Sequence, residues 1–209
     1  MFEGKRILIV AAHPDDIEFG MGGTLHKLLE EMTSLDQIKC VVFSDTTNLN
    51  GDSIITELDK SLGDLYGVEY VLKHDIQNMN FVHQDRELRQ SLHDLKTELN
   101  PDIIFSTSDT SDNTDHQILG KACLNVFQEQ TVIFYEILRG DYNFIPNMYV
   151  KLSEEDLKCK QTAIRLYETQ TSKRKYANDI TIENHMGYRG SQIQTKFAEC
   201  FEIKRILFI

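Results

Sequence analysis

The chain has 209 residues, 41% of them hydrophobic and 26% charged, which is ordinary for a globular protein with a full core. Its 22 basic and 33 acidic side chains give a formal net charge of −11, which argues against a nucleic-acid-binding domain with a basic face. The four cysteines form no Cys-x-x-Cys pair, so we expect neither disulfides nor a zinc–thiolate site. No apolar run approaches the roughly 20 residues that span a bilayer, and none resembles a signal peptide. We therefore expect a cytoplasmic protein.

Short β-rich runs alternate with longer amphipathic segments along the first two thirds of the chain. Residues 5–12 form a continuous apolar run, which is typical of a central parallel strand. Further strands are predicted over 37–44, 68–72, 102–106 and 131–138, and helices over 19–32, 54–66, 85–99 and 117–128. Repeated strand–helix units predict an α/β fold of the Rossmann-like, doubly wound type, with a mostly parallel sheet and helices on both faces.

The last third of the chain is less regular. Here we predict an extended segment over 144–150, a helix over 154–168 capped by Ser153, a long loop over 173–188, and one or two strands over 197–208. The basic run Lys173-Arg174-Lys175 has two interpretations, a solvated loop or a rim contact to an anionic substrate. No repeat or linker divides the sequence, so we expect a single domain over 1–209.

Two acidic, histidine-containing segments directly follow predicted strands. His13-Pro14-Asp15-Asp16 follows the first strand, and Asp115-His116 lies shortly after the fourth. In doubly wound sheets ligands bind beyond the carboxyl ends of the strands, so both segments are expected at one edge. Catalytic zinc usually has three protein ligands, and His13, Asp16 and His116 would supply two imidazoles and one carboxylate; ferrous iron suits the same set. Asp15 would then be free to accept a proton from water, whose pKa a metal lowers toward ~7. The pattern indicates a metal-dependent hydrolase.

Each of these residues also has a purely structural interpretation. His13 could be a packing residue, Asp15 and Asp16 could cap the following helix, and His116 could complete another cap. Adjacent carboxylates at a strand end repel each other unless a cation offsets them, and a divalent ion would do so directly. The glycines at positions 20, 22 and 23 do not fit Gly-x-Gly-x-x-Gly, and we expect them to allow close packing on the sheet and close approach of the substrate.

The sequence resembles the LmbE-like, or PIG-L, family of N-acetylglucosaminyl deacetylases. Ala12-His13-Pro14-Asp15-Asp16-Ile17-Glu18, followed by the three glycines and Thr24, is similar to the first motif of that family. Asp112-Asn113-Thr114-Asp115-His116 resembles the second, usually Asp-x-His-x-Asp-His. Segments 144–150, 188–192 and 198–202 are similar to the C-terminal segments, so the resemblance covers nearly the whole chain. It implies zinc-dependent removal of an N-acetyl group from an amino sugar or from its nucleotide- or lipid-linked conjugate.

The resemblance also implies a role for each site residue. His13, Asp16 and His116 become the metal ligands, Asp15 the general base, Asp115 the group that orients the neighbouring side chain of the second motif, and Arg189 a substrate contact. Asn113 departs from the family, which often has histidine there. An asparagine amide can donate a hydrogen bond to an oxyanion but cannot protonate the leaving amine. Asp15 would then carry the proton from water to the leaving nitrogen.

Three other functions stay open on the sequence alone. They are a metal phosphoesterase, a non-catalytic sugar- or nucleotide-binding member of the same fold in which Asn113 marks lost activity, and an assembly component. The charge density of His13, Asp15 and Asp16 counts against the last. For a deacetylase the partner is a small-molecule amino sugar, with no nucleic acid and no membrane span. The sequence does not decide between a monomer and a homo-oligomer, and it names neither the sugar nor the metal.

Overall fold

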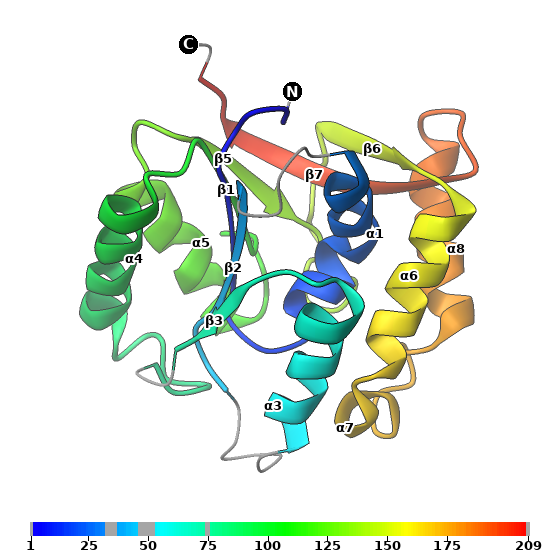
Figure 1. Cartoon of the computed structure of the whole chain (residues 1–209), viewed down its shortest axis with the longest axis horizontal. Helices are drawn as coiled ribbons and strands as arrows, with labels where there is room; N and C mark the ends of the chain where they lie inside the picture. The colour runs from blue at the N-terminus through cyan, green and yellow to red at the C-terminus, as the bar shows by residue number, and fades with distance from the viewer. Residues whose placement is uncertain (1, 32–36, 46–52, 74–75, 208–209) are drawn as a thin grey trace.

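The fold is built on one mostly parallel sheet. The structure is a computed structural model and describes residues 2–31, 37–45, 53–73 and 76–207 (Figure 1). In these residues a seven-stranded sheet has the order β3-β2-β1-β4-β5-β7-β6. The strands are β1 (Ile7–Ala11), β2 (Ile38–Val42), β3 (Tyr70–Leu72), β4 (Ile103–Ser106), β5 (Thr131–Tyr135), β6 (Met148–Leu152) and β7 (Phe197–Arg205). The first five are parallel, and β7 pairs antiparallel with both β5 and β6. The predicted fold class is confirmed.

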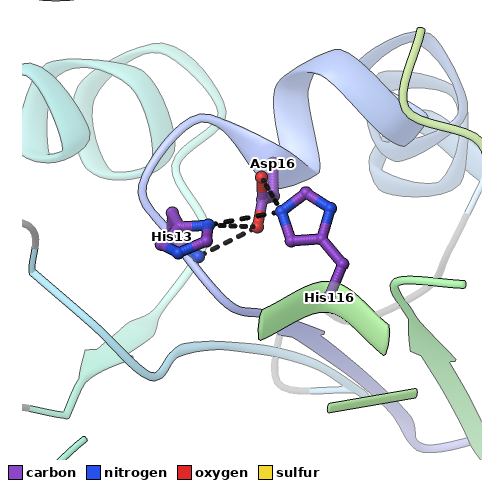
Figure 2. A group of neighbouring side chains, drawn as sticks. All are labelled: His13, Asp16 and His116. Carbon is purple, nitrogen blue, oxygen red and sulfur yellow. Dashed lines mark hydrogen bonds and ion pairs between the residues drawn. The ribbon is translucent and has the colours of Figure 1, made fainter. Parts of the chain in front are cut away.

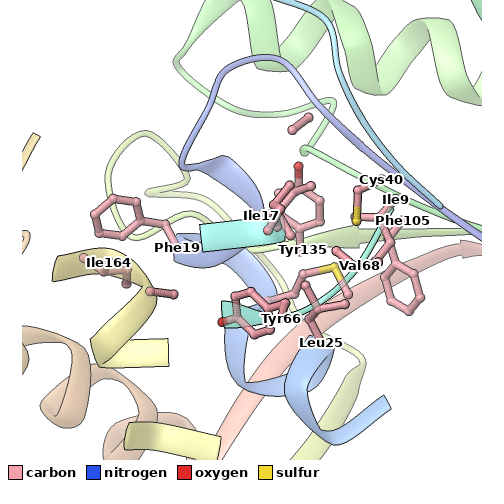
Figure 3. Close-up of a cluster of buried hydrophobic side chains, with 14 of the residues drawn as sticks. Ile9, Ile17, Phe19, Leu25, Cys40, Tyr66, Val68, Phe105, Tyr135 and Ile164 are labelled. Atoms are coloured by element: carbon pink, nitrogen blue, oxygen red, sulfur yellow. The ribbon is translucent and has the colours of Figure 1, made fainter. Parts of the chain in front are cut away.

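Helices cover both faces of the sheet because successive side chains of its central strand point to opposite sides. Leu8 and Val10 of β1 belong to a core shared with α4 (Asp85–Leu99) and α5 (Thr114–Val126). Ile7 and Ile9 belong to the opposite core, shared with α1 (Asp16–Glu31), α3 (Ser53–Leu58) and α6 (Glu154–Arg165). Figure 1 shows the two groups of helices on either side of the sheet, and Figure 3 shows part of the second core. This double covering explains the continuous apolar run of the first strand.

Helix α1 approaches the sheet closely through Gly20. A Cβ atom there would lie 2.2 Å from Cδ2 of Tyr135, so no other residue fits without movement of that ring. The helix departs from helical geometry at Met21, where φ is −148° and ψ is 23°. The expected packing role of the glycines is therefore confirmed. Gly20, Gly22 and Gly23 are buried against core side chains, so substrate access, their other expected role, finds no support.

The predicted loop over 173–188 is wrong, because α8 (Asp179–Ser191) occupies most of it. The sequence of this segment does not predict a helix, because its β-branched residues and two glycines have low helix propensity. The cap residue Asn178 accepts a hydrogen bond from the N–H of Thr181, and Ile182 and Met186 are buried in the core. Gly190 lets the helix lie against β7, because a Cβ atom there would be 2.7 Å from the carbonyl oxygen of Lys196. Tertiary packing overrides local propensity here.

Other predicted boundaries move by a few residues. The helix predicted over 54–66 is α3 followed by a π-helical segment η2 (Asp59–Leu65), and that over 154–168 divides into α6 and α7 (Glu168–Thr171). The extended segment expected over 144–150 is β6, shifted by a few residues, and the last segment is one strand, β7. Met32 and Phe208, predicted helix and strand ends, lie outside the described residues. No helix in the described ranges has the length and apolar character needed to cross a bilayer.

Candidate active site

The loop between β1 and α1 carries the first motif to the carboxyl edge of the sheet. Asp16 begins α1, and its Oδ2 accepts hydrogen bonds from the backbone N–H groups of Ala12 (3.1 Å) and His13 (2.9 Å). Asp15 has a φ of 92°, in the left-handed region that costs a non-glycine residue roughly 1–3 kcal/mol. The Asp16 carboxylate thus fixes a strained loop, and strain of this kind gathers at functional sites.

The start of α5 brings the second motif to the same edge. Asn113 is the N-cap, and its Oδ1 accepts hydrogen bonds from the N–H groups of Asp115 (2.9 Å) and His116 (3.4 Å). The helix therefore begins at Thr114, three residues before its predicted start, and both Asp115 and His116 lie in its first turn. Because β1 and β4 are parallel neighbours, the segments that follow them meet.

Three side chains from these two segments converge on one point (Figure 2). His13 Nδ1 lies 3.2 Å from His116 Nε2, and His116 Nε2 lies 3.2 Å from Asp16 Oδ1. His13 Nδ1 lies 3.6 Å from Asp16 Oδ2. Zinc bonds of about 2.0–2.1 Å in a tetrahedral site place ligand atoms roughly 3.3–3.4 Å apart. The donor types and their spacing therefore fit a zinc-sized cation, and this is the one such group found in the described part of the chain.

The ring of His13 has a carboxylate on its other nitrogen. His13 Nε2 lies 3.2 Å from Asp115 Oδ2, and the Asp115 carboxylate also accepts hydrogen bonds from the N–H groups of Met79 (2.6 Å) and Phe81 (3.4 Å). Such a partner fixes the tautomer and orientation of a ligating histidine. Asp115 was expected to orient a neighbour in its own motif, whereas its carboxylate contacts the histidine of the first motif. Nδ1 of His116 has no hydrogen-bond partner among the described residues.

The carboxylates make this position favourable for positive charge. Burial by itself would lower the pKa of His13, but hydrogen bonds to Asp115 and Asp16 and their charges raise it to about 10. Burial would raise the pKa of Asp16, but the charge of His116 and hydrogen bonds from both histidines hold it below its ordinary value. A cation bound between these groups would replace the proton that His13 otherwise attracts.

Asp15 lies beside this set without belonging to it. Its side chain is buried, and its Oδ2 lies 3.4 Å from Nη1 of Arg174. Burial and the charge of Asp16 raise the pKa of Asp15 well above its ordinary value, against the opposing charge of Arg174. A carboxyl group in such surroundings is suited to accept a proton and return it.

A cavity of about 350 Å³ opens over these residues. Among the predicted site residues, its lining includes His13, Asp15, Asp16, Asn113 and His116. Asp115 lies behind this wall, in contact with His13. Arg189 does not line the cavity; both its Nε (2.9 Å) and its Nη2 donate to the carboxylate of Glu136. Its role as a substrate contact stays a prediction.

Comparison with known proteins identifies the family. The model of the PIG-L family, described as GlcNAc-PI de-N-acetylase, matches residues 8–127, which include both motifs and more than half of the chain. The chain belongs to the PIG-L deacetylase family. The uncharacterized deacetylase YaiS of Escherichia coli (strain K12) is 25% identical over 179 residues, which cover 79% of this chain and 91% of that protein.

Two solved structures share the fold of this family member. The conserved protein TT1542 from Thermus thermophilus matches with a TM-score of 0.80 and 20% identity, over 98% of this chain and 97% of that one. The N,N'-diacetylchitobiose deacetylase from Pyrococcus horikoshii matches with a TM-score of 0.76 and 19% identity, over 95% of this chain and 83% of that one. The likeness extends beyond the segment matched by the family model, to the strands of the last third.

Several cavity residues were not singled out from the sequence. Arg139 and Gly140 follow β5, and the rule that placed the two motifs at the carboxyl edge would have placed this segment there as well. Tyr142 and Tyr176 line the cavity without any sequence signal of their own. Arg174 belongs to the basic run with two interpretations, and its position in the cavity wall favours the rim contact over the solvated loop.

Proposed function

We propose that this PIG-L family protein is a metal-dependent N-deacetylase that removes the acetyl group from an N-acetylated amino sugar, with zinc as the metal and ferrous iron as the alternative. The observation that carries the proposal is the convergence of His13 Nδ1, Asp16 and His116 Nε2 at the cavity, beside Asp15. Family membership supports deacetylation. The structural neighbour named as a chitobiose deacetylase supports a sugar as the carrier of the acetyl group.

In this proposal His13, Asp16 and His116 hold the cation, which when bound supplies Lewis-acid activation of water and of the acetyl carbonyl. Asp15 accepts a proton from the water as the water oxygen bonds to the carbonyl carbon. The C–N bond then breaks, and Asp15 returns the proton to the leaving nitrogen, so acetate and a free amine result. Arg174, 3.4 Å from the Asp15 carboxylate, holds that group in place.

Asn113 supplies the oxyanion contact in this mechanism. Its Oδ1 already accepts two backbone hydrogen bonds at the start of α5, so its amide N–H₂ is the group left for a ligand. A donor of this kind can contribute a few kcal/mol to stabilisation of the developing oxyanion. The amide cannot donate a proton to the amine, which is why Asp15 serves as both base and acid.

Acetate release tests the proposal. The zinc-loaded protein is expected to release acetate from N-acetylglucosamine glycosides, to lose this activity with a chelator, and to regain it with added zinc. His116→Ala should abolish both zinc binding and turnover, whereas His93→Ala, on the exposed side of α4, should change neither. Release of phosphate instead of acetate from phosphorylated glycosides, or sugar binding without any turnover, would overturn the proposal in favour of a phosphoesterase or a binding protein.

A further inference from the structure

We propose that Arg139 and Arg174, which share the ring of Tyr176, bind an anionic group carried by the substrate, so that the amino sugar is a phosphorylated or carboxylated conjugate. This inference rests on the proposed function and narrows its substrate class. All three side chains line the cavity that also contains His13 and Asp15. They come from two segments far apart in the sequence, one after β5 and one after α7.

The two guanidinium groups are arranged around one aromatic ring. The Cζ atom of each lies 6.0 Å from the ring centroid of Tyr176, within the range of a cation–π contact. Arg174 also donates from Nη1 to the Tyr176 hydroxyl, at 2.9 Å. A planar guanidinium held in this way presents its N–H groups in a fixed fork, which matches the oxygens of a phosphate or a carboxylate.

The charges of this wall are only partly balanced. Arg174 is paired with Asp15, but Arg139 forms no ion pair within the part of the chain that the structure describes. Asp112 is the exposed carboxylate among the cavity residues, and it is not paired with either arginine in the same described part. Among the described residues the guanidinium of Arg139 therefore has no carboxylate partner, and an anionic group on the ligand would supply one.

The position of this pair suits a group attached to the reacting sugar. Arg174 Nη1 lies 3.4 Å from Asp15 Oδ2, and Asp15 is the group that acts on the scissile amide in the proposed mechanism. An anion held by Arg139 and Arg174 therefore lies in the same cavity as that amide. The contact with Asp15 gives Arg174 two roles, so Arg139 is the residue whose removal isolates anion recognition.

Three substrates and two variants test this inference with the zinc-loaded enzyme. The substrates are the methyl glycoside of N-acetylglucosamine, which is neutral, its 1-phosphate, and its carboxymethyl glycoside. We expect the wild type to prefer one or both anionic substrates. Arg139→Gln should lower kcat/KM for them by roughly tenfold to a hundredfold, mainly through KM, and change the neutral substrate less than about twofold. The phosphate and carboxylate arms then identify the group recognised.

Lys175→Gln is the matched control, because Lys175 is an exposed cation of the same segment that does not line the cavity. Lys175→Gln should leave kcat/KM unchanged for all three substrates. Equal losses of kcat/KM for neutral and anionic substrates in Arg139→Gln, or no anionic preference in the wild type, would overturn the inference while the deacetylase proposal stands.

Calorimetric titration with glucosamine 1-phosphate gives a readout without turnover. Binding of this compound should weaken in Arg139→Gln and not in Lys175→Gln. If no substrate releases acetate, the deacetylase proposal fails, and unchanged binding of this probe in Arg139→Gln would overturn the anion site separately.

Discussion

The ammonium of Lys160 and the carboxylate of Glu199 form a buried ion pair, 2.6 Å between Nζ and Oε1, where α1 departs from helical geometry. Glu199 accepts hydrogen bonds from the N–H groups of Gly23 (3.1 Å) and Thr24 (2.7 Å), just beyond the break. Lys160 donates to the carbonyl oxygen of Phe19 (2.7 Å), just before it. Each charge thus lies at the helix end whose dipole it complements, and the pair stabilises the segment that begins with Asp16.

Breaking this pair should destabilise the protein strongly. Lys160 is only 3% exposed, and Glu199→Gln leaves its ammonium without a counter-charge, so we expect the free energy of unfolding to fall by about 3–5 kcal/mol. The double variant Lys160→Met/Glu199→Gln removes the uncompensated charge and should recover part of that loss. Urea unfolding of the two variants and the wild type measures both effects. A double variant less stable than Glu199→Gln would contradict the assignment of the loss to an unpaired buried charge.

Gly20→Ala should destabilise the protein through overpacking. The new Cβ atom would lie 2.2 Å from the Tyr135 ring, whose hydroxyl is held by the carbonyl oxygen of Val10 (2.8 Å), so the ring cannot move freely. We expect a loss of about 1–3 kcal/mol in the free energy of unfolding. Gly63→Ala is the control, because nothing lies within 4 Å of its Cβ position, and in a helical segment it should be neutral or stabilising by up to ~1 kcal/mol. Equal effects of the two substitutions would show that helix propensity, not packing against Tyr135, determines the change in the free energy of unfolding.

The sequence predicts the carboxyl edge of the sheet well because the signals there are local. The apolar run before His13 shows where β1 ends, and parallel neighbouring strands then bring the segment at His116 to the same edge. The segment that carries Arg174 and Tyr176 follows no strand of the parallel sheet, so its place in the cavity wall is not predictable in this way. Tyr176, after α7, contacts Arg139, in the loop after β5, and neither segment's own sequence pattern predicts that contact.

The same limit explains α8 and Arg189. The helix depends on burial of Ile182 and Met186 against a core that includes β7, not on the propensity of its own residues. Once the helix forms, Arg189 lies against Glu136 at the end of β5 instead of in the cavity lining. A motif similarity places a residue near a site, but the direction of its side chain depends on the helix that carries it.

Glu136 makes the stability of the fold depend on pH. Its burial would raise its pKa, but hydrogen bonds from His185 Nε2 (3.0 Å) and Arg189 lower it to about 2. Because the folded pKa lies below the ordinary 4.5, the ionised carboxylate stabilises the fold above about pH 4.5 and loses this effect as the pH falls toward 2. Glu136→Gln should therefore cost about 1–3 kcal/mol at pH 7, with a smaller difference from the wild type at pH 3. Urea unfolding at both pH values checks this.

The exposed Glu129, just before β5, provides the control for that measurement. Glu129→Gln should stay within ~0.5 kcal/mol of the wild type at pH 7 and at pH 3. A constant deficit of Glu136→Gln across the same range would mean that the substitution acts through packing and not through the charge of the carboxylate.

Asn113 combines two roles that a pair of substitutions separates. Asn113→Ser keeps a side-chain oxygen to cap α5 and removes the amide donor, so turnover should fall by about 10²–10³ with little loss of stability. Asn113→Ala removes the cap as well and should cost about 1 kcal/mol of unfolding free energy in addition. Acetate release and thermal unfolding of both variants give the two readouts. Full turnover by Asn113→Ser would mean that the amide does not contact the oxyanion.

Asp15→Asn should abolish turnover while zinc still binds. Asparagine tolerates the left-handed backbone conformation that Asp15 adopts, so the loop that carries His13 and Asp16 should keep its shape. The amide cannot accept a proton from water, and we expect kcat to fall by about 10²–10⁴, whereas zinc affinity, measured by competition with a chelator, should change less than about tenfold. Asp112→Asn removes an exposed carboxylate from the same cavity and should leave turnover within about twofold. Near wild-type turnover by Asp15→Asn would exclude this carboxylate as the proton carrier, and loss of zinc would instead make it a ligand.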